Sequence, residues 1–355
     1  MKKHNFSAGP CVLPQEVFEK AAQAVLEYNN EGLSLIEMSH RSAPFVEVME
    51  KARSLVKEIL EVPEGYSVLF LQGGASLGFY ISALNYLKEN GSAAYINTGT
   101  WSNKAIKEAR LVGEIQEIAS SADSNFSYVP KSYQIPPSDY LHITSNNTIY
   151  GTQMKSFPES PIPVICDMSS DIFSRKINVA DFAMIYAGAQ KNLGPAGTTL
   201  YIIRDELLGQ TNRKIPSMLD LNVHIGKDSM FNTPPVFSIY TSMLTLEWLK
   251  GLGGVSVMEK MNQDKADLLY NEIDRNSLFK GIAAKEDRST MNATFLLEDN
   301  SLSADWDSLW NEAGINGLKG HRSVGGYRAS MYNALKKESV NVLVELMKEL
   351  EAKKG

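Results

Sequence analysis

Cysteine is almost absent from this sequence of 355 residues, and its scarcity excludes the sites that depend on it. Cys11 and Cys166 lie far apart and form no CxxC pattern, which indicates neither a disulfide framework nor a cysteine-ligated zinc site. The five histidines are scattered and form no HxxxH pair. We therefore expect no metal site.

Long apolar runs and an excess of positive charge are also missing. No run approaches the ~18 apolar residues that a membrane span needs. The N-terminal stretch MKKHNFSAGPCVLPQE has two lysines but no apolar core, so it does not resemble a signal peptide. The net charge is −6 with both signs interspersed, so no basic face for nucleic acid is predicted. We expect a cytoplasmic protein that binds neither nucleic acid nor a membrane.

Buried-looking strands alternate with helices through most of the chain. Apolar periodicity after Pro14 and Pro44 predicts two early helices, and a strand follows at 66–72. The other predicted strands of this part are 92–99, 140–146, 163–168, 182–189 and 198–204. This alternation predicts an α/β fold with a mostly parallel central sheet flanked by helices.

A second, smaller domain is expected at the C-terminal end. Residues 237–273 read as two helices broken at Gly251 to Gly254. A strand at 291–299 and an amphipathic helix from Ser339 follow, which is typical of an α+β unit. We predict a large cofactor-binding domain over 16–256 and a small domain made of 1–15 and 257–355.

Polar residues stand at the ends of several predicted strands. Lys191 follows the strand at 182–189, and Asp167 ends the strand at 163–168. Most lysines are surface charges, but the carboxyl ends of parallel strands meet at one edge of the sheet, where ligands bind. The stretch LQGGAS runs into a helix whose free N–H groups suit a phosphate, although a Gly pair alone is more often a plain turn. Trp101, after another strand, suits either core packing or stacking on a planar ring.

A phosphate seat, an acid, an aromatic plate and a lysine together match pyridoxal 5′-phosphate. The lysine amine can bond to the cofactor aldehyde, and the acid can pair with the ring nitrogen. Once substrate has bound, the freed lysine can carry the proton that transamination moves. The combination is more specific than any one of its members.

Nine motifs in order carry a family resemblance across nearly the whole chain. They are FSAGPCVLP, EMSHRS, GGAS, NTGTWS, SNNTIYGTQ, DMSSDIFSR, GAQKNLGPAG, NTPPVFSIY and GLKGHRSVGGYRASMYNA. On these motifs the sequence resembles the phosphoserine aminotransferases, a family of class V, fold-type I pyridoxal-phosphate enzymes. The resemblance implies a ping-pong transferase that moves an amino group from glutamate to 3-phosphohydroxypyruvate, giving 2-oxoglutarate and O-phosphoserine for serine biosynthesis. It also implies a candidate second substrate, a phosphorylated threonine analogue of vitamin B6 (pyridoxine) biosynthesis.

The resemblance assigns the cofactor site residue by residue. Lys191 would bond the cofactor and Asp167 would pair with its ring nitrogen. The other cofactor-binding residues that it implies are Ala75, Ser76, Trp101, Thr148, Gln190, Asn232 and Thr233. Asn232 and Thr233 would come from the neighbouring subunit of a homodimer with composite active sites. Ser76 departs from family members that carry arginine there, which removes one cationic contact.

Cationic residues on the substrate side form two His-Arg pairs and a further arginine. They are His40, Arg41, His321, Arg322 and Arg328. Any one of them alone would ordinarily be a surface cation. The guanidinium fork, however, matches carboxylate and phosphate groups bidentately. The resemblance assigns Arg328 to the α-carboxylate, the two pairs to the substrate phosphate and the distal carboxylate of glutamate, and Ser7 to the same substrate site.

Four other functions compete with this interpretation. A class V aminotransferase for serine, alanine or glyoxylate would keep Lys191 and Asp167 but would not need two His-Arg pairs. A cysteine desulfurase needs a reactive cysteine late in the chain, and Cys166 lies in an apolar strand. A Rossmann dehydrogenase has a GxGxxG motif after its first strand, and the stretch QGGASLG does not match that motif. A non-catalytic pyridoxal-phosphate-binding protein predicts the loss of a chemical residue, and none is missing.

Overall fold

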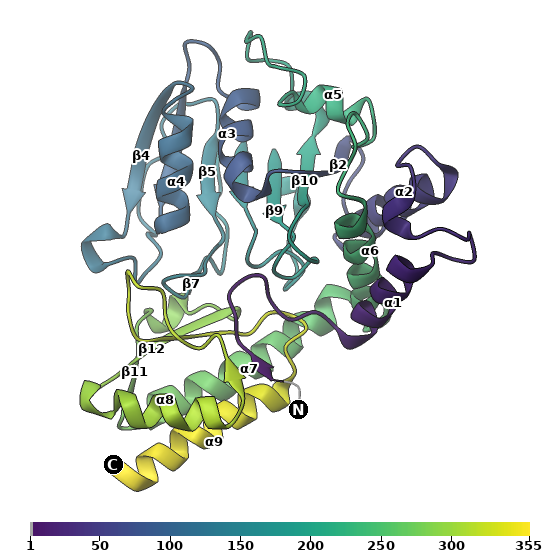
Figure 1. The fold of residues 1–355 in the computed structure, drawn as a ribbon. Helices are drawn as coiled ribbons and strands as arrows, with labels where there is room; N and C mark the ends of the chain where they lie inside the picture. Colours follow the sequence, from purple (N-terminus) through teal and green to yellow (C-terminus); the bar gives the residue numbers. More distant parts are fainter. Residues whose placement is uncertain (1–2) are drawn as a thin grey trace.

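The computed structural model describes residues 3–355 and is built around a seven-stranded sheet (Figure 1). In spatial order its strands are β2 (Tyr66–Leu71), β10 (Thr199–Arg204), β9 (Met184–Gly188), β8 (Val164–Asp167), β5 (Leu141–Thr144), β3 (Ser92–Asn97) and β4 (Glu114–Ser120). From β9 to β4 all neighbours pair in parallel, whereas β10 is antiparallel to β2 and β9. The predicted α/β fold with a mostly parallel sheet is confirmed.

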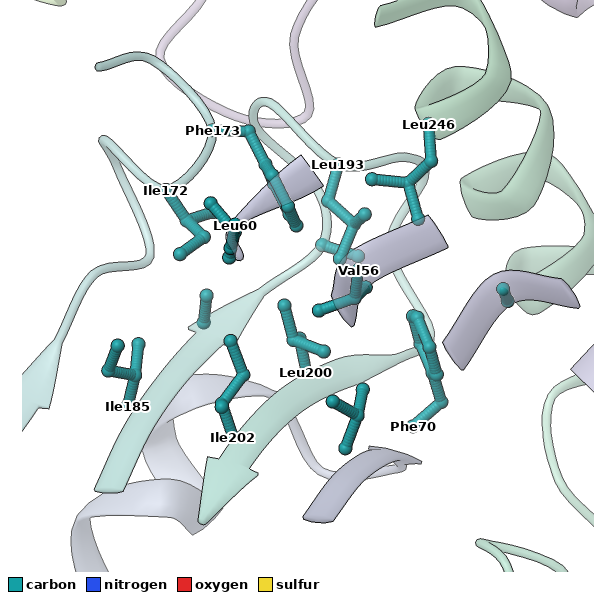
Figure 2. Close-up of a cluster of buried hydrophobic side chains, with 14 of the residues drawn as sticks. Val56, Leu60, Phe70, Ile172, Phe173, Ile185, Leu193, Leu200, Ile202 and Leu246 are labelled. Carbon is teal, nitrogen blue, oxygen red and sulfur yellow. The ribbon is translucent and has the colours of Figure 1, made fainter. Parts of the chain in front are cut away.

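Helices cover both faces of this sheet. On one face α3 (Gly74–Tyr86) and α4 (Thr100–Ala109) enclose a cluster that contains Tyr95, Tyr186 and Tyr201. On the other face α1 (Gln15–Leu26), α2 (Ala43–Ile59) and α6 (Val236–Gly251) enclose a larger cluster. Figure 2 shows sheet side chains in this larger cluster meeting those of the helices and loops above them: Ile185, Leu200 and Ile202 on the sheet, and Val56, Leu60, Ile172, Phe173, Leu193 and Leu246 around them.

The predicted apolar faces of the first two helices are the ones that become buried. In the predicted stripe of α1, Val17, Ala21 and Ala24 are buried, as is Tyr28 just after the helix end, whereas Val25 is only half-buried. In α2 a proline stands in the first turn, and every apolar residue of the predicted stripe from Phe45 to Ile59 is buried. The periodicity of the sequence therefore locates both helices correctly.

A second hydrophobic cluster lies at the C-terminal end of the chain. It is formed by α7 (Gly254–Arg275), β11 (Phe279–Gly281), β12 (Asn292–Leu297), α8 (Ser303–Glu312), β14 (Tyr327–Ser330) and α9 (Lys337–Lys354). Phe6 joins it because β1 (His4–Asn5) pairs with β13 (Ile315–Asn316). The helix α7 contributes Met258 to the larger sheet cluster and Ala266 to this one. The domain boundary at residue 256 stays a prediction.

Several boundaries differ from the sequence expectation. The helix predicted to follow the stretch LQGGAS, from Leu77 onward, already begins inside that stretch at Gly74, because Gly73 has a φ of 100° and turns the chain directly into α3. The last helix begins at Lys337, ahead of Ser339. Elements that were not predicted include β4, α5 (Leu221–Ile225), β6 (Asn146–Asn147) and β7 (Thr152–Gln153). Within residues 3–355 no helix combines the length and apolarity that a membrane crossing requires.

Candidate active site

A cavity of about 380 Å³ lies at the carboxyl ends of β8 and β9, between the central sheet and the C-terminal unit. The predicted site residues that line it are Ala75, Ser76, Trp101, Thr148, Asp167, Gln190, Lys191, His321 and Arg328. They come from segments spread over most of the chain. The rule that the ends of parallel strands meet explains why Asp167 and Lys191 are together.

Other predicted residues do not line this cavity within the described part of a single protomer. They are Ser7, His40, Arg41, Asn232, Thr233 and Arg322. The Ser7 hydroxyl accepts from Asn316 Nδ2 at 3.2 Å, and Asn232 Nδ2 donates to Gln72 Oε1 at 3.4 Å. Arg41 and Arg322 are exposed. Their predicted roles stay predictions.

Lys191 is a buried amine with a specific partner. Its Nζ donates to Thr148 Oγ1 at 2.9 Å. Burial lowers the pKa of Lys191 to about 8, opposed by the negative charge of Asp167 and assisted by the positive charge of Arg328. At pH 7 an amine with this pKa is neutral in roughly a tenth of molecules, far more than an ordinary lysine, and the neutral amine is the form that bonds to an aldehyde.

Asp167 is a buried carboxyl at the end of β8. It accepts a hydrogen bond from the Ser169 backbone N–H at 2.9 Å. Burial raises the pKa of Asp167, while the hydrogen bonds from Ser169 and the charge of Lys191 act in the opposite direction. A buried carboxylate is strongly stabilised by a cationic partner, and a protonated ring nitrogen would be one.

Thr148 connects the amine to the guanidinium of Arg328. Its hydroxyl accepts from Lys191, and its carbonyl accepts from Arg328 NH1 at 3.4 Å. Burial lowers the pKa of Arg328. Among residues 3–355, the buried Arg328 Nε has no hydrogen-bond partner, so part of its donor fork is available to a ligand.

The N-terminus of α3 and the ring of Trp101 complete the wall. Gly74, Ala75 and Ser76 form the first turn of α3, whose N–H groups have no intrahelical partners. These groups and the helix dipole favour an anion such as a phosphate. Lys191 Nζ lies 6.0 Å from the centroid of the Trp101 ring, so a planar ring bonded to the lysine can reach that indole.

Positive charge surrounds the outer part of the cavity. The pKa of His321 is lowered, first by burial and then by the charges of Arg328, Arg322 and Lys104. These cations make the opening attractive to an anionic substrate. Lys104 was not predicted; its Nζ lies 4.6 Å from the Trp101 ring centroid, and only its position three residues after Trp101 in α4 could have indicated it.

Further lining residues were also missed by sequence reasoning. They are Ala8, Gly9, Gly74, Phe79, Thr144, Asn146, Ile149, Ser169 and Ser170. Several lie inside the quoted motifs FSAGPCVLP, SNNTIYGTQ and DMSSDIFSR, so those motifs were the available signal. Some of them act through their side chains on other residues of the site, as the Ser169 side chain does on Asp167, and such a role is not evident from the residue type alone.

These residues fit pyridoxal phosphate on structural grounds. A buried amine, a buried carboxyl, a helix N-terminus and an indole line one cavity. Among the described residues, the buried Trp101 Nε1 also lacks a hydrogen-bond partner. Each part of the cofactor thus has its own partner in the cavity: the amine would meet the aldehyde, and the carboxyl would meet the ring nitrogen. The indole would meet the ring face, and the helix N-terminus would meet the phosphate.

Comparison with known proteins gives the same class. The family model described as aminotransferase class-V matches residues 3–343. The chain therefore belongs to the class V aminotransferases, which depend on pyridoxal phosphate. It is 64% identical to the phosphoserine aminotransferase of Flavobacterium psychrophilum, over 99% of this chain and 100% of that protein. Within the class, the chain is a member of the phosphoserine aminotransferase family.

Solved structures of the same family share the fold. The phosphoserine aminotransferase of Bacillus circulans subsp. alkalophilus superposes with a TM-score of 0.97 at 42% identity, covering 100% of this chain and 99% of that one. The pyridoxal-phosphate-bound enzyme of Trichomonas vaginalis gives a TM-score of 0.93 at 35% identity, covering 98% of this chain and 100% of that one. The fold-type I architecture expected from the sequence is confirmed.

Proposed function

We propose that the protein transfers an amino group from glutamate to 3-phosphohydroxypyruvate, giving 2-oxoglutarate and O-phosphoserine for serine biosynthesis. The observation that carries this proposal is the convergence of cations on the cavity that contains Lys191 and Asp167. A substrate with both an α-carboxylate and a phosphate matches such a site, because the Arg328 guanidinium can pair with one anion and the cations near His321, which are Arg322 and Lys104, can attract the other.

Arg328 binds the α-carboxylate that both substrates share. Its guanidinium is held at one side by the Thr148 carbonyl, and its buried Nε points to no protein acceptor among residues 3–355. The same Thr148 accepts from the Lys191 amine. The α-carbon of a bound amino acid is thereby brought near Lys191, which is the geometry that proton transfer requires.

Asp167 and Lys191 have different roles in the proposed reaction: Asp167 stabilises charge and Lys191 transfers a proton. When bound, pyridoxal phosphate supplies an electron-withdrawing ring that weakens the bonds at the α-carbon of the amino acid. Asp167 keeps a negative charge beside the ring nitrogen, in a site where burial makes that interaction strong. Lys191 Nζ, with its lowered pKa, accepts the α-proton as a general base and returns it as a general acid.

The two His-Arg pairs take the second anionic group of each substrate. In a ping-pong reaction one pocket must hold the phosphate of one substrate and the distal carboxylate of the other. Histidine can adjust its charge between a dianion and a monoanion. His321 lines the cavity, and Arg322 follows it in the same loop.

A homodimer with composite active sites is part of this proposal. His40, Arg41, Asn232 and Thr233 do not line the cavity within the described residues of their own protomer, so we assign them to the site of a second copy. We also propose a cytoplasmic location, which the two free cysteines support. Cell fractionation followed by detection of the protein tests the location.

A paired assay tests the proposed reaction. Glutamate with 3-phosphohydroxypyruvate should give rapid turnover, whereas alanine with glyoxylate should give little. The opposite preference would assign the protein to another aminotransferase activity. A third arm with the phosphorylated threonine analogue of vitamin B6 synthesis measures the second candidate substrate, which presents the same two anions.

A further inference from the structure

The chain makes an unusual turn directly after Asp167. Phe173 has a φ of 61°, a left-handed conformation that is rare for a bulky residue. The side chains of Ile172 and Phe173 are buried in the larger sheet cluster, where Figure 2 shows them beside Leu193 and Leu60. Such a conformation persists only where surrounding contacts determine it.

Three consecutive carbonyls of this turn accept hydrogen bonds from three asparagine side chains. The pairs are Asn192 Nδ2 with Ile172 O at 3.0 Å, Asn333 Nδ2 with Phe173 O at 3.0 Å, and Asn262 Nδ2 with Ser174 O at 3.1 Å. Each asparagine comes from a different part of the chain. We call them the asparagine triad.

The members of the triad also bond to one another. The Asn333 backbone N–H donates to Asn192 Oδ1 at 3.0 Å, and Asn262 Nδ2 donates to Asn333 Oδ1 at 2.9 Å. Their exposed fractions are 5% for Asn192, 1% for Asn262 and 3% for Asn333. Because water cannot replace these bonds, breaking one leaves a buried polar group unpaired.

The triad joins the three segments that carry the site. Asn192 follows Lys191 directly, Asn333 follows Arg328 on the chain that leaves β14, and the turn itself follows Asp167. Asn262 lies on α7. A second residue of this helix, Lys265, also holds the segment just before Asn333, because its Nζ donates to the carbonyls of Met331 and Tyr332.

We propose that the asparagine triad is a positioning device that fixes the segments of Asp167, Lys191 and Arg328 relative to one another. The three asparagines are positioning residues, because none of them lines the cavity within the described chain. A carboxamide suits this task, since it donates and accepts at once in a fixed plane. The inference rests on the proposed function through the assignment of Arg328 to the α-carboxylate.

Kinetics of Asn192→Ala and Asn333→Ala test the proposal. Both substrates present an α-carboxylate, so a shift of Arg328 relative to Lys191 should lower kcat/KM for both half-reactions to a similar extent. A misplacement of about 1 Å predicts a loss of roughly ten- to hundredfold. Asn192→Asp, which retains an acceptor for the Asn333 N–H, should lose less activity than Asn192→Ala.

Asn85→Ala is the matched control. Asn85 on α3 is equally buried, and it makes three bonds to backbone groups: to Ile81 O, to Leu219 O and from Leu221 N–H. It should lower the melting temperature as the triad variants do, while leaving both kcat/KM values unchanged. Triad variants that lose stability but keep wild-type kcat/KM for both half-reactions would overturn the proposal.

Amide hydrogen exchange of the cofactor-free protein supplies a readout that is independent of activity. Asn192→Ala should accelerate exchange over residues 327–333, and Asn85→Ala should not; equal protection in both variants would contradict the proposal. If Asn192→Ala fails to fold, Asn262→Ala on α7 makes the same comparison. A wild type that is inactive towards 3-phosphohydroxypyruvate would refute the proposed function. The proposal on the triad would then still be tested, by comparing kcat/KM of the triad variants and of the wild type for an amino donor that the wild type accepts.

Discussion

The pKa of the Lys191 amine can be measured by titration, and it reports how buried and how charged the surroundings of the amine are. Burial lowers its pKa to about 8, and the charge of Asp167 raises it against that effect. Because the pKa is lowered, the neutral amine should predominate above about pH 8 in the cofactor-free protein. Asp167→Asn removes the opposing charge, so the midpoint should move to lower pH.

The measurement is the pH dependence of Lys191 acetylation by a dilute acylating reagent, followed by mass spectrometry of the peptide. The exposed Lys107 in the same samples is an internal reference for reagent activity. A midpoint near that of ordinary lysine, about 10.4, would contradict the burial argument. Asp167→Asn should also lose most turnover, because a neutral amide cannot stabilise a protonated ring nitrogen.

We expect Arg328 to act in both half-reactions, and Arg41 and Arg322 mainly in the one that uses the phosphorylated substrate. Arg328→Lys should weaken both half-reactions, since a charged hydrogen bond is worth ~1.5–3 kcal/mol, or roughly ten- to hundredfold in kcat/KM. Arg41→Ala and Arg322→Ala should reduce kcat/KM for 3-phosphohydroxypyruvate more than for glutamate, because a phosphate dianion gains more from each guanidinium.

Arg110→Ala, which removes an exposed arginine at the end of α4, is the control and should change neither value. Equal losses for both substrates in Arg41→Ala and Arg322→Ala would refute the phosphate-selective role. No loss for either substrate would make both arginines ordinary surface charges.

At the scale of elements, the close packing of α3 on β9 positions the first turn of α3, which is the proposed phosphate seat. A Cβ on Gly78 would lie 2.8 Å from the Tyr186 ring, whose hydroxyl is hydrogen-bonded to His142 Nε2 at 2.8 Å. The ring is buried and cannot move away freely. Gly78→Ala should therefore lower stability by about 1–3 kcal/mol through overpacking, measured by thermal unfolding.

Gly251→Ala in α6 is the control for Gly78→Ala, because it makes the same substitution in a helix. No heavy atom lies within 4 Å of its added methyl group among the described residues, and helix propensity favours alanine by up to ~1 kcal/mol. It should be neutral or stabilising. A Gly78→Ala variant as stable as Gly251→Ala would show that the α3–β9 contact adapts without cost.

Elements with a strong apolar pattern were predictable from sequence. The helix α2 and the buried strands β8 and β9 were located correctly, because one side or both sides of each are buried. The edge strand β4 was missed, since its residues EIQEIAS are half exposed and its pairing to β3 is decided by tertiary structure. The start of α3 depended on the left-handed conformation of Gly73, which the sequence GGAS does not specify.

Only the part of the site that depends on residue type and on position at a strand end could be predicted from the sequence. Asp167 and Lys191 could be paired, because the ends of neighbouring parallel strands meet. The asparagine triad could not be predicted, because its members are far apart in sequence and asparagine is ordinarily a surface residue. Arg41 and Asn232 do not line the cavity within the described residues of one protomer, and their proposed place in the site of a second copy stays a prediction.

At the scale of the whole molecule, large apolar side chains are exposed on and after α1. Leu26 is 78% exposed, Ile36 is 61% exposed, and Phe18 and Leu33 belong to the same region. We predict that these residues form one interaction surface, because contiguous exposed apolar patches mark such surfaces. The segment continues into His40 and Arg41, so a second copy that covers these apolar residues would also receive that His-Arg pair near its own site.

Sedimentation of the wild type and of Ile36→Asp tests whether this surface forms a homodimer. The wild type should be a dimer, and the aspartate should weaken it because a charge would be desolvated at the interface. Leu111→Asp is the control: Leu111 is 74% exposed after α4, on the opposite face of the sheet from α1, and its substitution should leave the dimer intact. A fully active wild-type monomer at assay concentration would refute the dimer.

Complementation tests the composite site directly. Lys191→Ala and Asn232→Ala subunits should each form inactive or weak homodimers. In a mixed dimer one site receives an intact Lys191 from one subunit and an intact Asn232 from the other, so mixing after exchange of subunits should restore activity at that site. Heterodimer formation is verified by differently tagged subunits. Verified heterodimers without recovered activity would show that Asn232 serves its own protomer, where it contacts Gln72 beside the N-terminus of α3.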